Sequence, residues 1–110
     1  MTTYQVRLVD ANRRCIGTAH VVQQNGGFEG TADLQLMPAE MAAVFSKFEA
    51  VVNGQMFSLL DESEQAIDDL QVRVVFPSGE ESLCEELQLM PGTGHIRFRA
   101  VGLVANRATG

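Results

Sequence analysis

The sequence predicts an α+β fold in which an antiparallel sheet of about six strands is packed by one or two helices. Segments that alternate apolar and polar residues stand at both ends of the chain, and a segment with helical spacing stands between them. Turn-forming residues separate the alternating segments. The expected order is therefore β-β-β-α-(α)-β-β-β, with two three-stranded meanders. These form either one six-stranded sheet or a partly closed barrel with the helices on one side, and the sequence does not distinguish the two.

The first meander is expected in residues 4–9, 15–23 and 28–36. Tyr4, Val6 and Leu8 alternate with polar neighbours, as in a half-buried strand. A turn is expected over residues 10–13, and Gly26 and its neighbours form the strongest hairpin signal because such residues accept a positive φ. In the third segment every second residue from 28 to 36 is expected on the apolar face.

The helix that follows is expected over residues 38–52. Pro38 suits a first helical turn, where its missing N–H costs nothing. Asn53 and Gly54 are expected to end the helix with a left-handed cap. Its apolar stripe recurs at three-and-four spacing and consists of Met41, Val44, Phe45, Phe48, Val51 and Val52.

Residues 55–70 are ambiguous between a second helix and a short strand followed by an acidic loop. The helix is favoured, because residues 56, 59, 60, 63, 67 and 70 share one stripe and a long loop is unusual in a compact domain. Ser58 and Asp61 resemble a capping box, and the acids that follow suit a helix N-terminus.

The second meander is expected in residues 71–76, 83–90 and 95–104, with a turn at 77–80. In the middle strand the alternation places Leu83, Leu87 and Leu89 on one face and Cys84 on the other. In the last strand, Arg97 and Arg99 are expected to point outward. A single domain is expected over residues 1–104, with a frayed tail at 105–110.

A pentapeptide, Leu-Gln-Leu-Met-Pro, occurs twice, at residues 34–38 and 87–91. It suggests two similar strands that a proline stops. Residues 5–9 also resemble 71–75, and residues 17–21 resemble 92–96, but the three matches do not keep one order along the chain. The alternatives are an ancient duplication and the recurrence of similar residues in similar strands.

The charge restricts the classes of partner. The formal net charge is −6, which argues against binding nucleic acid, because a nucleic-acid site needs a lysine and arginine footprint. No apolar run is long enough to cross a membrane. No secretory signal is recognised, and Cys15 and Cys84 are isolated. We therefore expect a cytoplasmic protein with two reduced thiols, the alternative being a disulfide between them in an oxidising compartment.

Residues that could carry catalysis or ligate metals do not form a recognisable constellation. His20 and His95 both follow a Gly-Thr-x sequence in expected strands, but Cys15, Cys84 and Asp33 show no metal-ligand spacing around them. No nucleophile elbow and no phosphate loop is present. We therefore expect no cofactor and no metal ion, and a non-enzymatic role.

The leading functional hypothesis is a small interaction domain, of an inhibitor or immunity type as one variant, whose acidic surface binds a protein partner with a basic surface. The expected site residues are Asp61, Glu62, Glu64, Asp68, Asp69, Glu80, Glu81, Glu85 and Glu86. One alternative is a small-ligand or catalytic pocket between helix 38–52 and the sheet, lined by His20, His95 and methionines. A second alternative is a homo-oligomer formed through an open sheet edge at residues 71–76.

Overall fold

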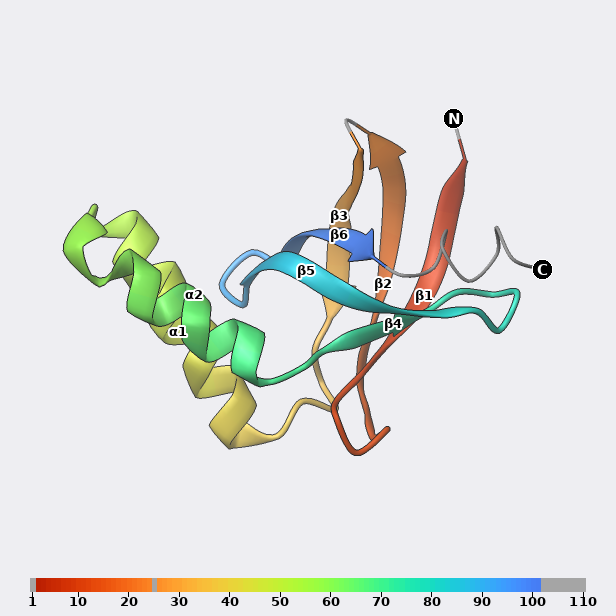
Figure 1. Cartoon of the computed structure of the whole chain (residues 1–110), viewed down its shortest axis with the longest axis horizontal. Coiled ribbons are helices and arrows are strands. Elements are labelled where there is room, and N and C mark those ends of the chain that lie inside the picture. Colours follow the sequence, from red (N-terminus) through yellow and green to blue (C-terminus); the bar gives the residue numbers. More distant parts are fainter. Residues whose placement is uncertain (1, 25, 102–110) are drawn as a thin grey trace.

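A computed structural model of the chain describes residues 2–24 and 26–101. Within this part, six antiparallel strands form a closed barrel in the order β1-β2-β3-β6-β5-β4. The prediction of an α+β fold is confirmed, and of the two arrangements the barrel is the correct one (Figure 1). The expected tail at 105–110 and the end of the domain at 104 lie outside the described residues. The strands are β1 Thr3–Val9, β2 Cys15–Gln24, β3 Gly27–Asp33, β4 Arg73–Val75, β5 Glu81–Met90 and β6 His95–Val101.

The barrel closes where β1 pairs with β4, and these strands carry the two similar sequences at 5–9 and 71–75. Arg7 lies opposite Val75, Leu8 opposite Val74, and Val9 opposite Arg73. The two strands are therefore related by an approximate two-fold axis through the Leu8–Val74 pair. The closed strand order also stays the same when β1, β2 and β3 are exchanged for β4, β5 and β6, because the result is the same order read in the reverse direction. The sequence similarity between residues 5–9 and 71–75 therefore coincides with this approximate two-fold symmetry of the barrel.

The repeated pentapeptide does not form two similar structures, so that prediction was wrong. Residues 87–90 lie in β5, whereas residues 34–38 form a turn that leads into a helix. The strand expected over 28–36 ends at Asp33, whose carboxylate accepts a hydrogen bond from the Gln35 N–H (3.1 Å). This local bond favours a turn over further strand pairing. Leu36, expected on the apolar face, is 64% exposed.

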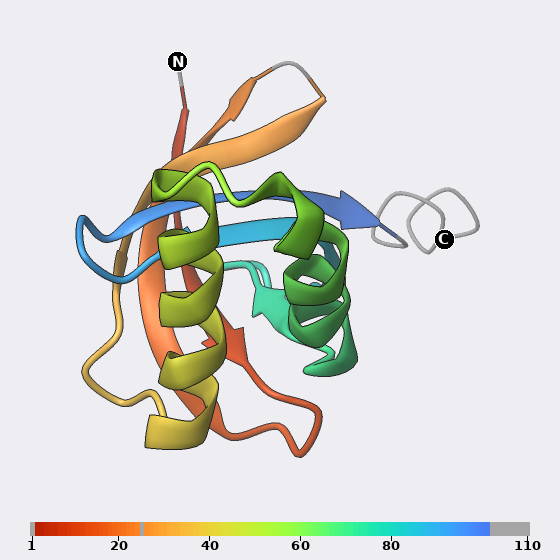
Figure 2. The same ribbon diagram turned by 90° about the vertical axis from the view of Figure 1, so that its left-hand side faces the viewer.

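Helices α1 (Ala39–Asn53) and α2 (Leu60–Asp69) lie side by side over one side of the barrel (Figure 2). Met41, Phe45, Phe48 and Val51 of α1 are buried, as its spacing predicted. Met41, Phe45 and Phe48 join the residues that alternate inward from the strands in one hydrophobic core. The space between α1 and the barrel is thus occupied by core side chains, where the sequence had suggested a ligand pocket as an alternative.

The ambiguous segment 55–70 is helical, since a short 3-10 helix, Phe57–Leu59, leads directly into α2. Two expected caps are absent from the described residues. Ser58 makes no capping hydrogen bond at α2, and Gly54 has a right-handed conformation with φ −86°. The left-handed residue after α1 is Gln55 (φ 56°), one position later. The N–H groups of Gln55 and Met56 bond to Val52 and Val51 carbonyls, which closes the helix end.

Strand β5 contains a bulge that reverses its inward and outward faces. Glu85 pairs with Arg99 and Gln88 pairs with Arg97, so β5 has one extra residue between these pairs. Cys84 is buried before the bulge, and Leu87 and Leu89 are buried after it. Unbroken alternation predicted Cys84 and Leu87 on opposite faces of the strand, and this prediction was wrong because the extra residue of the bulge brings both to the inner face.

Candidate functional site

The nine acidic residues expected to form one surface lie in three places. Five lie on α2 and are exposed: Asp61, Glu62, Glu64, Asp68 and Asp69. Glu85 and Glu86 are exposed at the β5 bulge. Glu80 and Glu81 lie in and beside the turn between β4 and β5, which in Figure 1 extends away from the helices. The fold therefore does not bring all nine together.

The carboxylates of α2 and of the bulge do meet. Two hollows of about 270 and 240 Å³ adjoin between these elements, and Asp68 and Glu86 line both. Glu85 lines the first hollow and Glu64 lines the second. We call these four carboxylates, Glu64, Asp68, Glu85 and Glu86, the acidic groove. Leu83, Leu87 and the buried Cys84 also line these hollows.

Glu86 occupies the position that shapes the groove. Its φ of 52° is in the left-handed region, which costs a residue with a Cβ about 1 kcal/mol or more. Glycine is the usual residue at such a position in a bulge. The bulge places Glu85 and Glu86 next to each other on the outside of the barrel, where an unbroken strand would point one of them inward. The strained backbone at Glu86 thus belongs to the bulge that places the Glu85 and Glu86 carboxylates side by side on the surface.

Several of the nine carboxylates are already paired with cations. Glu81 lies 2.8 Å from Arg13 Nη1 and 3.6 Å from Arg73 Nη1. Glu62 lies 3.8 Å from Lys47 Nζ. Glu86 accepts a hydrogen bond from Arg99 Nη1 at 2.8 Å, which raises the pKa of the Arg99 guanidinium. These pairs reduce the negative potential beside Glu62 and Glu81, which lie outside the groove.

Three members of the acidic groove have no such cation. Among the residues that the structure describes, Glu64, Asp68 and Glu85 form no ion pair. Asp69, the neighbour of Asp68, accepts a hydrogen bond from Gln65 Nε2 (2.9 Å) along the exposed helix face. The unbalanced charge of this surface is therefore concentrated between α2 and the bulge.

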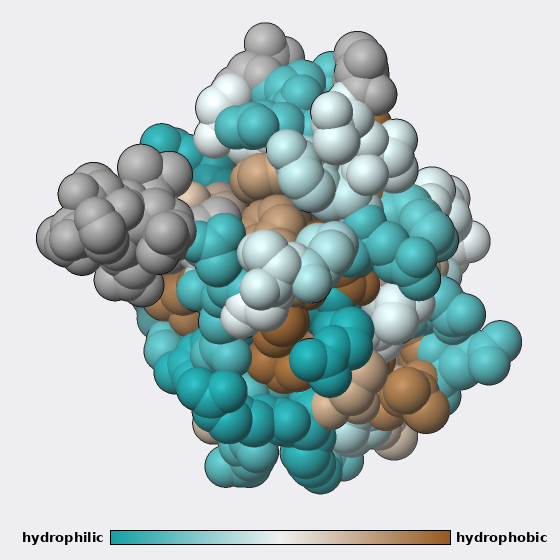
Figure 3. Space-filling view, turned by 90° about the vertical axis from the view of Figure 1, so that its right-hand side faces the viewer, coloured by the Kyte–Doolittle hydropathy of each residue, from teal (hydrophilic) through white to brown (hydrophobic). Residues whose placement is uncertain are grey.

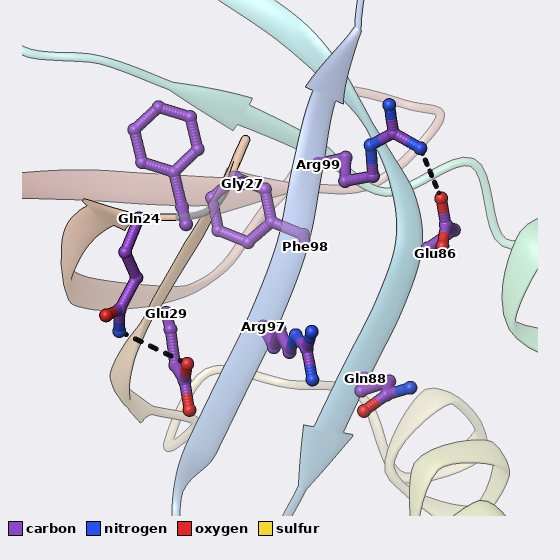
Figure 4. Close-up of a pocket in the computed structure, with 9 residues that line it drawn as sticks. Gln24, Gly27, Glu29, Glu86, Gln88, Arg97, Phe98 and Arg99 are labelled. Atoms are coloured by element: carbon purple, nitrogen blue, oxygen red, sulfur yellow. Dashed lines mark hydrogen bonds and ion pairs between the residues drawn. The ribbon is translucent and has the colours of Figure 1, made fainter.

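A polar hollow of about 170 Å³ continues from the groove across β5, β6 and β3 (Figure 4). Arg97 lies in it between Glu29 and Gln88, and Arg99 reaches across to Glu86. The sequence predicted that both arginines point outward. It could not show that they lie beside Glu86, because that placement depends on the register shift at the bulge.

The two histidines lie on the outer surface of the barrel. His20 pairs with Thr31, and Thr31 pairs with His95, so one strand separates them. His20 is exposed, and His95 Nε2 lies 2.8 Å from Glu29 Oε2. The alternative pocket lined by both histidines and the methionines is not assembled at α1, where Met41 belongs to the core.

Within the part of the chain that the structure describes, the cysteines and the other acids do not assemble a metal centre. Both Cys15 and Cys84 are free thiols, and burial raises the pKa of Cys84 to about 12. No group of three or more His, Cys, Asp or Glu side chains with metal-binding geometry occurs in residues 2–24 and 26–101. None of the helices in this part is long and apolar enough to span a membrane.

Comparison with known proteins gives no assignment, since no family model, no curated protein and no solved structure matches the chain.

Proposed function

We propose that this protein is an interaction domain whose acidic groove binds basic side chains of a protein partner. The observation that carries the proposal is the convergence of Glu64 and Asp68 from α2 with Glu85 and Glu86 from β5 on two adjoining hollows. Glu86 is paired with Arg99, whereas Glu64, Asp68 and Glu85 form no ion pair among the described residues and can attract arginine or lysine from outside.

The shape of the groove favours side chains over a flat basic surface. Each hollow is large enough for the end of a long side chain, and the apolar parts of Leu83 and Leu87 can contact its methylene groups. Arg99 is hydrogen-bonded to Glu86 and also interacts electrostatically with Glu85, so the two α2 carboxylates of the groove are the ones we expect the partner to contact most strongly. A partner with two or more arginines or lysines in one exposed segment fits this arrangement.

The proposal includes a cytoplasmic location, which is supported by the two free thiols. It does not include assembly through the edge at residues 71–76, because β4 pairs with β1 on one side and with β5 on the other. It also leaves Glu80 and Glu81 out of the binding surface, since Glu81 is held by Arg13 and Arg73.

The test compares Asp68→Lys with Asp69→Lys in binding a fluorescently labelled arginine-rich peptide, followed by anisotropy. Both variants change the net charge equally and lie on the same helix, but only Asp68 lines the groove. Asp68→Lys is expected to raise the Kd by about tenfold or more, and Asp69→Lys by about threefold or less. Replacing both is expected to abolish binding.

Salt provides the second control. The affinity of the native protein should fall as ionic strength rises above about 0.15 M, where exposed charges are screened beyond about 8 Å. Equal effects of the two single variants would reduce the interaction to the general negative charge of the protein. That result would reject the groove as the binding site.

A further inference from the structure

An arginine adjoins the acidic groove through a third hollow. The polar hollow of about 170 Å³ meets the groove at Glu86, which lines all three hollows, and at Gln88, which lines two of them. The polar hollow also contains the side chain of Arg97 (Figure 4). At the end of the molecule away from the helices, by contrast, hydrophobic residues reach the surface among hydrophilic ones (Figure 3). A partner that occupies the groove therefore lies next to a cation of this protein.

Arg97 is exposed and forms no ion pair with the residues that the structure describes. It lies opposite Glu29 in the pairing of β3 with β6. Both oxygens of Glu29 have other partners: Oε2 lies 2.8 Å from His95 Nε2, and Oε1 accepts a hydrogen bond from Gln24 Nε2 at 3.3 Å. Glu86, the other carboxylate that lines the hollow, is bonded to the neighbouring arginine of β6. The N–H donors of Arg97 are thus available to a group from outside.

Arg97 and Gln88 together can hold a carboxylate. They lie opposite each other in the pairing of β5 with β6, and both line the polar hollow. A guanidinium donates two parallel hydrogen bonds to a carboxylate, and the amide N–H groups of Gln88 can donate another. A free anion gains little here, because the net charge of −6 repels it. A carboxylate tethered to basic groups that already occupy the groove overcomes this repulsion through its high effective concentration.

We infer that the partner segment carries an aspartate or glutamate beside its basic residues, and that Arg97 and Gln88 bind this carboxylate while the acidic groove binds the basic groups. Neighbouring strands lie about 5 Å apart and an extended chain advances about 3.3 Å per residue, so the acidic residue stands about two to four positions from a basic one. This inference rests on the proposed function and adds the order of charges that the partner presents. A segment of mixed sign binds in one register, whereas a purely basic segment can slide along the groove.

The test uses pairs of arginine-containing peptides that differ at one position, which is glutamate in one peptide and glutamine in the other. This position is varied over about two to four residues on either side of the arginines. Binding to the full chain is followed by fluorescence anisotropy. At one position the glutamate peptide is expected to bind about threefold more tightly than the glutamine peptide. General attraction to the negative protein predicts the opposite order, because glutamate lowers the positive charge of the peptide.

Two variants locate the carboxylate. Arg97→Gln should remove the preference for glutamate and bind the glutamine peptide at least as tightly as the native protein does, which also shows that the variant is folded. Arg7→Gln is the matched control, because Arg7 is exposed and forms no ion pair within residues 2–24 and 26–101. It lies on β1, across the closed barrel from β6, so Arg7→Gln should keep the preference.

The inference and the proposed function fail through different results. The inference is overturned if glutamate is preferred at no position, if the preference survives Arg97→Gln, or if Arg7→Gln removes it as well. In each of these cases, loss of glutamine-peptide binding in Asp68→Lys would still support the acidic groove. Glutamine-peptide binding that is absent, or unchanged in Asp68→Lys, would reject the proposed function and with it this inference.

Discussion

Glu86 is the residue at which strain and surface charge coincide. It has the left-handed φ of 52° that the bulge requires, and it holds Arg99 at 2.8 Å while lining the acidic groove. The ion pair is exposed, with side chains 60% and 66% accessible, so it contributes little to stability. The position is therefore better explained by the carboxylate that it presents than by the stability of the fold.

The comparison of Glu86→Gly with Glu86→Ala tests this explanation. Both variants remove the carboxylate, but only glycine relieves the left-handed strain, so Glu86→Gly should be more stable than Glu86→Ala by about 1 kcal/mol. Urea unfolding measures this difference. Both variants should bind the arginine-rich peptide equally weakly. A glycine variant no more stable than the alanine variant would show that the bulge carries no strain.

Cys84 shows the effect of burial on a single ionisable group. Its pKa of about 12 leaves only about one thiolate in ten thousand at pH 8, and the thiolate is the reactive form. Ellman's reagent should therefore react with the half-buried Cys15 in the native protein and with Cys84 only after unfolding. In the Cys15→Ser variant no thiol should react before denaturant is added. Rapid reaction in that variant would contradict the buried position of Cys84.

Among the elements, α1 contributes most of the helical part of the core. Phe45 is 0% exposed, whereas Phe57 in the 3-10 helix is 66% exposed. Phe45→Ala is expected to lower the free energy of unfolding by about 3–5 kcal/mol, and Phe57→Ala by about 0.5 kcal/mol or less. Denaturant unfolding of the two variants measures both values. Similar losses would mean that α1 does not cover the barrel as described.

The presence of the helices and strands could be predicted from the sequence, because the spacing of apolar residues indicates which residues are buried. The α1 stripe and the alternation in β1 needed no other information. The bulge in β5 was missed because a left-handed Glu86 has no sequence signature, and one extra residue reverses the faces of the strand. The turn at residues 34–38 was missed because the strand ends at Asp33, whose carboxylate accepts a local hydrogen bond from the Gln35 N–H.

At the scale of the molecule, closure of the barrel decides which predicted residues meet. The sequence indicated an acidic stretch, but its residues lie on α2, at the bulge and at a turn. Only the packing of α2 on β5 brings Glu64 and Asp68 to Glu85 and Glu86, and this packing cannot be read from local patterns. The sequence therefore predicted that the candidate site is acidic, but not which of the nine acidic residues come together in it.

The barrel also separates two surfaces of different chemistry. The acidic groove lies beside the helices, and a hollow lined by Tyr4, Phe28 and Phe76 lies at the other end of the barrel. A formal net charge of −6 attracts cations to the whole molecule, so affinity alone does not locate binding. A residue-resolved measurement is needed to assign it.

The most direct measurement is an NMR titration of the full chain with the arginine-rich peptide at about 0.15 M ionic strength. The proposed function predicts that shifts concentrate on the groove residues Glu64, Asp68, Glu85 and Glu86, and that they disappear in Asp68→Lys but persist in Asp69→Lys. Shifts spread evenly over the acidic residues, or centred on Glu80 and Glu81, would contradict it.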